Sequence, residues 1–521
     1  MIIDNTPRAG RREWIGLAVL ALPTLLVSFD VFVVLLALPH LSEALGASST
    51  QQLWIMDIYG FMLAGFLITM GTLGDRIGRR KLLLIGAAAF GSASILSAFS
   101  TSAAMLIAAR ALLGIAGATL TPSTLSLISN MFHDPRERAR AIGIWGGCFS
   151  VGAIIGPVVG GVLLSHFWWG SVFLLGVPAM VLLLVLGPLL LPEYRNSEAG
   201  RLDLISVVLS LAMILPIIYG IKELARDGWQ LLPALAIIAG GVFGIVFVHR
   251  QRRLPDPLLD LDLFSSGVLS TTLLCLLSYS MLSGTSMAFI GQHLQLVEGL
   301  SPLLASLAMA PGMLVSIVSF QLAPWLSHRV RPAHLIATGL LVTIAGLVVI
   351  TFASPTSGPA ILVFGFALST LGSGPVVTLG TDLVVGSAPA EKTGAAAALS
   401  QASNEFGISL GIGTLGSIGT LVYRTRIAGT IPPDVPTPAS QAARDTLASA
   451  TAAASHLPNH LAMDLLVPAR EAFTSELHAI AATSAVLLLG VAVLVVFMLR
   501  RVRPKRFQED YKEETLSKMA P

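Results

Sequence analysis

The stretch QLWIMDIYGFMLAGFLITMGTLGDRIGRRKLLLIGAAAFGSASILSAF, residues 52–99, shows the pattern that recurs along the whole chain. It contains two apolar runs, 52–72 and 81–99, joined by a short turn rich in arginine. A helix of roughly 20 apolar residues crosses the hydrocarbon core of a bilayer. Neither run alternates between polar and apolar residues, as a strand of a membrane barrel would. The stretch therefore predicts two transmembrane helices connected by a basic turn.

Similar apolar runs fill most of the remaining chain. The hydrophobic fraction is 54%, the charged fraction 12% and the mean hydropathy +0.80, whereas a soluble chain carries about 25% charged residues. We therefore expect an all-α, polytopic membrane protein with fourteen transmembrane helices. The runs lie near 14–38, 52–72, 81–99, 103–128, 140–164, 171–191, 202–220, 231–249, 268–290, 303–323, 334–353, 360–383, 396–420 and 479–499.

The composition also excludes several classes of protein. A cytosolic enzyme, a disordered chain and a disulfide-stapled secreted domain all need more polar residues or more cysteines. The two cysteines, Cys148 and Cys275, lie in apolar runs, so no disulfide framework is expected. The net charge of +3 does not predict a nucleic-acid partner, because the Lys and Arg are scattered between apolar runs and form no single patch.

The positions of Lys and Arg predict the orientation, because cytoplasmic loops carry an excess of both. If the N-terminal tail with Arg8, Arg11 and Arg12 is inside, every second loop after it is basic, and the tail from Arg500 onward is strongly so. We expect a multi-pass protein of the cell (inner or plasma) membrane with both termini cytoplasmic. The first span lacks a clear cleavage site and is expected to stay as a signal anchor.

The order of the runs predicts three units. These are an N-terminal six-helix bundle (1–195), two inserted transmembrane helices (196–255) and a C-terminal six-helix bundle (256–521) with a cytosolic tail. The long extracellular loop 421–478 is either a solvated insertion or a cap that gates the outer mouth. Short helices are expected in it over 440–456 and 467–481.

Four ionisable residues fall inside the apolar runs: Asp30, Asp57, Arg110 and Glu405. A charge at the centre of a bilayer costs about 2.5–3.5 kcal/mol or more, so each is a functional candidate. At 1.5 Å per residue, the first three fall in the outer half of the membrane and Glu405 falls near the midplane. Asp382 is a weaker candidate, since it lies at the inner end of its run, where we expect it to be solvated.

Carboxylates in an apolar cavity can bind either a proton or an organic cation. Desolvation favours the protonated form, and the ionised form attracts a cation, so competition at one site is the simplest form of antiport. The proton-coupling candidates are Asp30, Asp57, Arg110 and Glu405. The alternatives are a static Asp30–Arg110 ion pair and a permanently protonated Glu405.

Aromatic residues beside these acids suit a cationic partner through cation–π contact. For each of them, including Phe32, packing in the core or against lipid is the alternative. The expected substrate-binding residues are Asp30, Phe29, Trp54, Asp57, Tyr59, Phe61, Glu405 and Phe406.

The run 140–164 is rich in glycine, with Gly143, Gly152, Gly156-Pro157 and Gly160-Gly161. Small residues four apart allow close contact between membrane helices, and proline permits a kink. This spacing predicts either a moving element or simply a tightly packed helix.

These residues resemble the major facilitator superfamily, specifically its fourteen-span drug:proton antiporter branch (DHA2), over nearly the whole chain. The segment Gly71–Arg80 resembles the family's cytoplasmic motif between spans two and three, which acts as a conformational latch. The glycines of 140–164 resemble the antiporter motif of span five. The resemblance implies that the conformational residues are Gly71, Gly74, Asp75, Arg76, Gly78, Arg79, Gly152, Gly156, Pro157 and Gly160.

Further motifs narrow the resemblance. Arg110 with Gly114 and Gly117 resembles the span-four motif linked to proton transfer, and Asp30 resembles the acid of the span-one motif. The run 50–59 and the long loop before the last span are similar to those of QacA-type quaternary-ammonium multidrug efflux proteins. Some members carry two adjacent acids where this chain has Ser400-Gln401, and the run 303–323 has no acid. This departure favours monovalent over divalent cations.

Together these features predict a proton-coupled multidrug efflux antiporter that exports lipophilic cations, such as quaternary ammonium compounds, dyes and antiseptics, by alternating access. Export of another amphiphile, an antibiotic or a lipid, is the alternative, and a polytopic membrane enzyme is less favoured. We expect no enzyme activity, no metal and no cofactor other than the proton as coupling ion. The expected partners are small lipophilic cations and membrane lipid, with the chain acting as a monomer.

Overall fold

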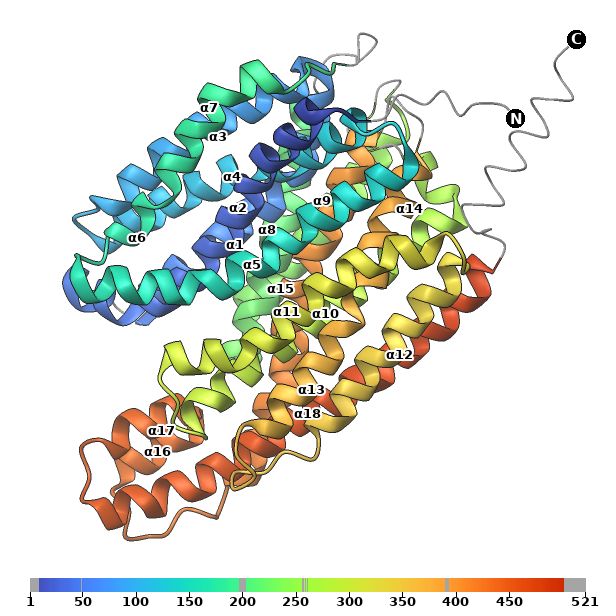
Figure 1. Cartoon of the computed structure of the whole chain (residues 1–521). Coiled ribbons are helices and arrows are strands. Elements are labelled where there is room, and N and C mark those ends of the chain that lie inside the picture. Colours follow the sequence, from blue (N-terminus) through green and yellow to red (C-terminus); the bar gives the residue numbers. More distant parts are fainter. Residues whose placement is uncertain are drawn as a thin grey trace, which may run out of the picture.

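The structure is a computed structural model that describes residues 9–47, 49–195, 203–254, 257, 259, 261–388 and 393–500. Within these residues every regular element is a helix, which confirms the all-α class. Figure 1 shows long helices packed side by side, with the start of α1 and the end of α18 on one side and α16 and α17 on the opposite side.

The helices follow the apolar runs. Those of the first half are α1 (Arg11–Leu45), α2 (Ser49–Ile77), α3 (Arg79–Ala98), α4 (Ala103–Met131), α5 (Pro135–His166), α6 (Ser171–Leu174), α7 (Gly176–Leu190), α8 (Leu204–Asp227) and α9 (Leu231–Gln251). Those of the second half are η1 (Leu261–Ser265), α10 (Gly267–Leu296), α11 (Pro302–Ser327), α12 (Pro332–Ile350), α13 (Ala360–Leu371), η2 (Pro375–Leu379), α14 (Gly380–Gly386), α15 (Thr393–Ile427), α16 (Thr437–Asp445), α17 (Leu447–Ala454) and α18 (Asn459–Leu499).

The number of membrane spans is not settled by length and hydropathy. Among the described residues ten helices are long and apolar enough to cross a membrane, or eleven if α2, bent by 51°, counts as one span. Helices α5, α8 and α15, which overlap expected spans, are not among them, and only the described residues enter this count. The multi-pass membrane fold is therefore confirmed, whereas the count of fourteen stays a prediction.

Helix contacts form two large hydrophobic clusters, one in each half of the chain. In the first half α1 packs against α5, and in the second half α10 packs against α15. The two halves meet through α5 with α11 and through α2 with α15. Since these pairs join equivalent positions of two six-helix units, they support duplication, and we retain the division at 195 and 255 as a proposal.

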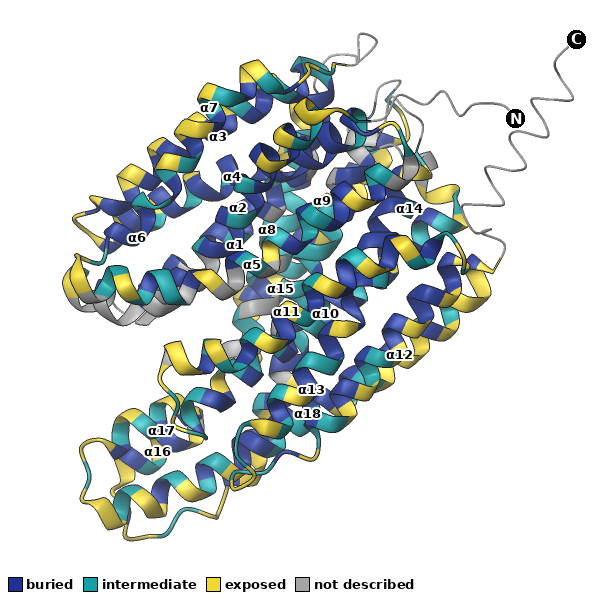
Figure 2. Ribbon diagram, viewed as in Figure 1, coloured by how far each residue is buried: buried dark blue, intermediate teal, exposed yellow. Residues whose placement is uncertain are grey.

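The outer surface of the bundle is apolar. Ile245 on α9 is 72% exposed and Val486 on α18 is also 72% exposed, and exposed residues line the outward faces of α7 and α12 in Figure 2. Such a surface would be unstable in water and suits contact with acyl chains.

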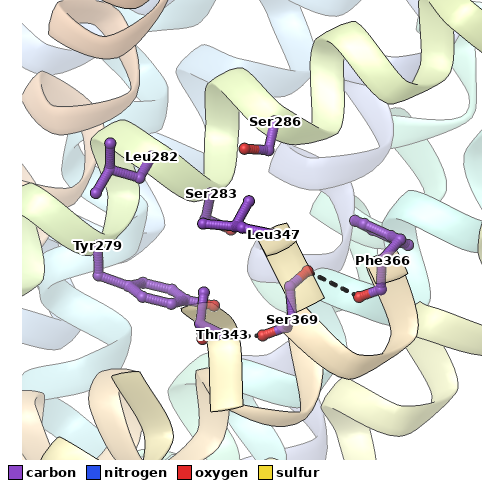
Figure 3. Close-up of a pocket in the computed structure, with 8 residues that line it drawn as sticks. All are labelled: Tyr279, Leu282, Ser283, Ser286, Thr343, Leu347, Phe366 and Ser369. Atoms are coloured by element: carbon purple, nitrogen blue, oxygen red, sulfur yellow. Dashed lines mark hydrogen bonds between the residues drawn. The ribbon is translucent and has the colours of Figure 1, made fainter. Parts of the chain in front are cut away.

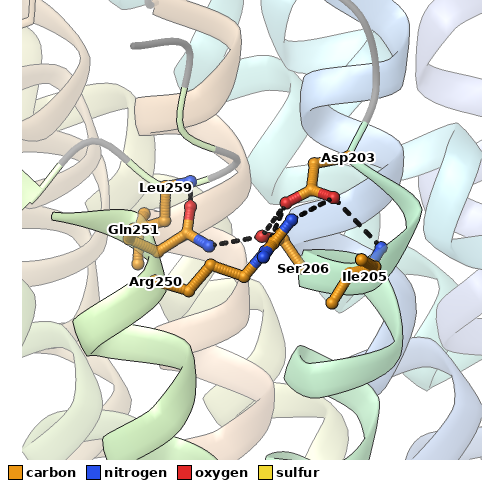
Figure 4. Close-up of polar contacts among 6 residues, drawn as sticks. All are labelled: Asp203, Ile205, Ser206, Arg250, Gln251 and Leu259. Carbon is orange, nitrogen blue, oxygen red and sulfur yellow. Dashed lines mark hydrogen bonds and ion pairs between the residues drawn. The ribbon is translucent and has the colours of Figure 1, made fainter. Parts of the chain in front are cut away.

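The inserted helices α8 and α9 are joined at their base by polar contacts (Figure 4). Asp203, which precedes α8, accepts hydrogen bonds from Arg250 Nε at 2.7 Å and Nη2 at 3.0 Å. The Arg250 hydrogen bonds lower the pKa of Asp203 from 3.8 to about 2. Gln251 Nε2 donates to Ser206 Oγ at 2.7 Å. Helix α8 is therefore fixed in position relative to α9.

The expected loop 421–478 is a packed helical unit. Helices α16 and α17 fall within or close to the first predicted short helix, and buried residues from 423–473 form a cluster of their own with Val297. The hydroxyl of Tyr423 donates to the Ala443 carbonyl at 2.7 Å. The prediction of a second, separate short helix over 467–481 is wrong, because α18 runs without a break from Asn459 to Leu499. Whether this unit is a solvated insertion or a cap that gates the outer mouth stays a prediction.

Candidate functional site

A buried ion pair joins α1 and α4. Arg110 Nη1 donates to Asp30 Oδ2, and Arg110 Nε donates to the Ile55 carbonyl of α2 at 3.1 Å. The side chains are 2% (Arg110) and 12% (Asp30) exposed. The structure thus brings together two of the four ionisable residues singled out in the sequence. A buried pair is weak support for stability by itself, so a functional role deserves testing.

Tyr59 of α2 covers this ion pair. The Arg110 guanidinium carbon lies 4.9 Å from the centre of the Tyr59 ring and 6.0 Å from that of Phe173 on α6. Glycine at 114 allows this approach, because a Cβ there would overlap the Tyr59 carbonyl oxygen. The buried Tyr59 hydroxyl has no hydrogen-bond partner among the described residues. Because buried hydroxyls are usually satisfied, this one is suited to a water or a substrate group.

Glu405 approaches the same region from the second half of the chain. Its Oε1 accepts a hydrogen bond from Gln401 Nε2 at 3.2 Å. Tyr59 lies within electrostatic range of Asp30, Arg110 and Glu405 together. The helices that carry these three residues, α1, α4 and α15, all contact α2, which carries Tyr59. One position away, Asn404 Oδ1 accepts from Ser280 Oγ at 2.8 Å and fixes α15 against α10.

The expected aromatic residues divide into two groups. Trp54, Phe61 and Phe406 share a hydrophobic cluster formed by α2, α4, α8 and α15, and the Trp54 and Phe61 rings meet edge to face at 5.9 Å. Phe29 is instead buried in the core of the first half, which agrees with the alternative of core packing. The side chains of Asp57 and Phe32 lie outside the described residues.

The conformational residues of the α2–α3 turn are held by buried contacts. Arg79 Nε donates to Asp75 Oδ1 at 2.8 Å, and Arg79 is fully buried. Gly78 has a φ of +110°, and a side chain there would meet Glu193. A Cβ at Gly74 would lie 2.8 Å from Arg79 Nη1, so glycine is needed for the arginine to fold over the turn. Gly71 is buried, and Arg76 is partly buried beside them.

The glycines of α5 serve close contacts with both halves. A Cβ at Gly152 would lie 2.5 Å from the Leu25 carbonyl oxygen of α1, and one at Gly143 would lie 2.8 Å from the Phe320 carbonyl oxygen of α11. Gly156 and Gly160 are buried, and the side chain of Pro157 lies outside the described residues. Helix α5 thus touches its own bundle and the opposite one, as a moving element would.

Asp382 was expected to be solvated, and that expectation is wrong. It is 7% exposed, and its Oδ1 lies 3.7 Å from Arg138 Nη2 at the start of α5. The contact joins the two halves of the chain at the end of the molecule that holds the α4–α5 turn. No sequence pattern indicates this pair, because its partners are more than 240 positions apart.

A separate hollow lies inside the second half and is not a drug site (Figure 3). Its lining includes Tyr279, Ser286 and Ser369, and its volume is about 10 Å³. A cavity of that size holds about one water molecule. Within the described part of the chain, no group of three or more His, Cys, Asp or Glu is arranged to hold a metal ion.

Comparison with known proteins relates this arrangement to transporters. A family model described as Major Facilitator Superfamily matches residues 20–412. The multidrug efflux pump LfrA of Mycolicibacterium smegmatis is 44% identical over 503 residues, which are 96% of this chain and 99% of that protein. The methyl viologen resistance protein SmvA of Salmonella typhimurium is 34% identical over 94% of this chain and 99% of its own length. The human organic anion transporter MFSD10 shares the fold, with a TM-score of 0.59 and 16% identity over 94% of this chain and 99% of that one.

Proposed function

The chain belongs to the Major Facilitator Superfamily, and we propose that it is a proton-coupled antiporter that exports lipophilic organic cations across the cell membrane. It is a multi-pass membrane transporter and not an enzyme, and its relatives are efflux and drug-resistance proteins that act on small molecules. Proton coupling, the cationic substrate, the cell membrane and cytoplasmic termini are our proposals beyond that.

The observation that carries proton coupling is the buried Asp30–Arg110 pair. A proton that binds Asp30 removes the negative partner of Arg110, and the freed guanidinium still has the Ile55 carbonyl and the Tyr59 ring as partners. The arginine can therefore remain charged when the pair opens. Since breaking a buried pair changes the local energy by several kcal/mol, a single proton can bias the helices that hold it.

The charge balance supports a monovalent cation as the substrate. Asp30, Arg110 and Glu405 together carry one net negative charge when all are ionised. An organic cation beside Glu405 neutralises that charge, and the rings of Trp54, Phe61 and Phe406 provide apolar contact close by. Tyr59 lies within electrostatic range of both acids. A proton on Asp30 and a cation near Glu405 are both positive charges in the same region, so each disfavours the binding of the other.

Alternating access follows from the way in which the two halves meet. Helices α5 and α11 form one part of the interface and α2 and α15 the other, so rocking one half against the other exposes Glu405 and the Asp30 pair to either side in turn. The proton would enter from outside and leave inside, while the cation moves outward.

We would test this with purified protein in liposomes, following ethidium transport driven by an imposed pH gradient. Asp30→Asn should reduce gradient-driven ethidium transport at least tenfold, and Asp464→Asn, which changes an exposed acid of α18, should not. Insertion and monodispersity of both variants serve as controls. Normal gradient-driven transport by Asp30→Asn would contradict the proposal.

The class of substrate is tested separately, with a panel of transported compounds. Tetraalkylammonium ions, methyl viologen and an uncharged amphiphile should be compared in the same liposomes. We expect monovalent cations to be transported in preference to the divalent and the uncharged compounds. Efficient transport of the uncharged compound would favour export of another amphiphile instead.

A further inference from the structure

The inserted helix α8 lies between the two halves of the chain and is not a peripheral addition. It contacts α2 of the first half and α15 of the second, whereas α9 packs mainly against α8. Leu211 and Leu215 of α8 pack over Gly65 of α2, where a Cβ would lie 3.2 and 3.1 Å from their methyl groups. Glycine at 65 therefore lets α8 approach α2 closely.

Helix α8 also completes the aromatic cluster beside Glu405. Ile214 and Leu215 pack against Ile58 and Phe61 of α2 in the cluster that contains Trp54 and Phe406. One turn further along α8, the ring of Tyr219 stacks on Trp54 with centroids 6.2 Å apart and an angle of 15° between the planes. Trp54 thus contacts Phe61 edge to face and has the nearly parallel Tyr219 ring as a second aromatic neighbour.

We propose that α8 forms a wall of the substrate site and that Tyr219 is a specificity-determining residue for planar aromatic cations. This inference rests on the proposed function and adds a residue from the inserted pair. Two aromatic faces hold a flat ring between them when they are about 7 Å apart, twice the carbon–carbon contact distance. The Trp54 and Tyr219 rings are nearly parallel, with their centroids 6.2 Å apart, so moving the two faces apart to that spacing would form a slot for a flat ring.

Two sets of contacts fix the position of α8, the helix that carries Tyr219. The Asp203–Arg250 and Ser206–Gln251 hydrogen bonds join α8 to α9, and Leu211 and Leu215 fix α8 on α2. When the Tyr219 ring moves away from that of Trp54, a planar cation can enter between the two faces, and it gains stacking and cation–π contact from both rings. A compact tetraalkylammonium ion has no flat face and gains little from this slot.

The test measures binding without any gradient. Purified wild type, Tyr219→Phe, Tyr219→Leu and Phe243→Ala are titrated with ethidium, a planar aromatic cation, and with tetrabutylammonium. Phe243, on α9, is 41% exposed on the apolar surface and serves as the matched control. Leucine fills most of the space of the tyrosine without an aromatic face, so Tyr219→Leu is expected to fold.

We expect Tyr219→Leu to weaken ethidium binding roughly 5- to 30-fold, the sum of one stacking and one cation–π contact, and to change tetrabutylammonium binding less than twofold. Tyr219→Phe and Phe243→Ala should bind both as the wild type does. Unchanged ethidium binding by Tyr219→Leu, or equal losses for both cations, would overturn the proposed role of Tyr219 but not the proposed function of the protein. A wild type that binds neither cation would overturn the proposed substrate class and this inference with it, whereas binding without proton coupling would leave the inference standing.

Discussion

At the residue scale, the ion pair in the α2–α3 turn allows a sharp comparison. Arg79 is fully buried against Asp75, while its neighbour Arg80 pairs with Glu193 at 3.5 Å with about a third of each side chain exposed. Arg79→Ala removes one member of a buried ion pair, which costs about 3–5 kcal/mol. Removing Arg80 costs roughly 0–1 kcal/mol, because the exposed pair is screened by solvent. We therefore expect Arg79→Ala, but not Arg80→Ala, to lower the midpoint of thermal unfolding in detergent by many degrees. Similar midpoints for the two variants would show that the Arg79–Asp75 pair does not stabilise the turn.

Glu405 supports a second prediction at this scale. Glutamine keeps the shape of the side chain and removes its charge, so Glu405→Gln should weaken cationic substrates roughly tenfold and uncharged ones little. Glu471→Gln, which changes an exposed acid of α18, is the control. Transport rates of ethidium and an uncharged dye in the same liposomes make the comparison. A loss of the same size for both compounds would assign Glu405 a structural role.

The sequence predicts the charged residues of the site better than its aromatic ones. Asp30 and Arg110 stand out because charge inside an apolar run is costly, and the structure joins them. Phe29 and Tyr59 look alike in the sequence and both are buried in the core of the first half, yet the Tyr59 ring also lies against the Arg110 guanidinium. The difference depends on which face of each helix meets its neighbours, and that is fixed by packing between distant segments. The stacking of Tyr219 on Trp54 cannot be predicted from the sequence for the same reason.

At the element scale, close contact between α10 and α15 depends on glycine. A Cβ at Gly411 would overlap the Met281 carbonyl oxygen, which cannot move without moving α10. A Cβ at Gly490 on α18 meets nothing within 4 Å. We expect Gly411→Ala to destabilise by about 1–3 kcal/mol through overpacking. Gly490→Ala should be neutral or stabilising by about 0.5–1 kcal/mol, because alanine favours the helix.

Thermal unfolding of the two glycine variants in one detergent, followed by transport assays on the folded fraction, would measure this difference. If Gly411→Ala were as stable as Gly490→Ala, the α10–α15 contact would have to be looser than the structure indicates.

The apolar runs predict where helices lie but not where they break. The run 360–383 is divided into α13, η2 and α14, where Pro375 begins a π-helical segment because proline donates no backbone hydrogen bond. In the opposite direction, α18 extends the last expected span by 20 residues toward its N-terminus, through Pro468. Tertiary contacts within the cap of α16, α17 and α18 stabilise that extension, and hydropathy alone does not register them.

At the scale of the whole molecule, the two halves are held together at one end. Gly143 of α5 closely approaches the Phe320 carbonyl of α11, and the Arg138–Asp382 pair lies near the same end, where the α4–α5 turn meets α14. We propose that this is the cytoplasmic end, as the positions of Lys and Arg predict, and that the structure is the state closed toward the cytoplasm. A transporter must break these contacts in each cycle, and their strength sets how the two states are populated.

The Arg138–Asp382 pair therefore provides a test of the whole conformational equilibrium. Asp382→Asn and Arg138→Gln should each reduce the equilibrium constant for the cytoplasm-closed state roughly twofold to fivefold, about 0.4–1 kcal/mol, since Arg138 is partly exposed. Spin labels at the exposed Thr101 and Thr356, in a background without Cys148 and Cys275, would report the separation of the two halves at the opposite end. Both single variants should shift the distance distribution toward shorter values, and the exchanged pair Arg138→Asp with Asp382→Arg should move it back toward the wild type. Identical distributions in all four proteins would mean that this ion pair does not hold the cytoplasmic end closed.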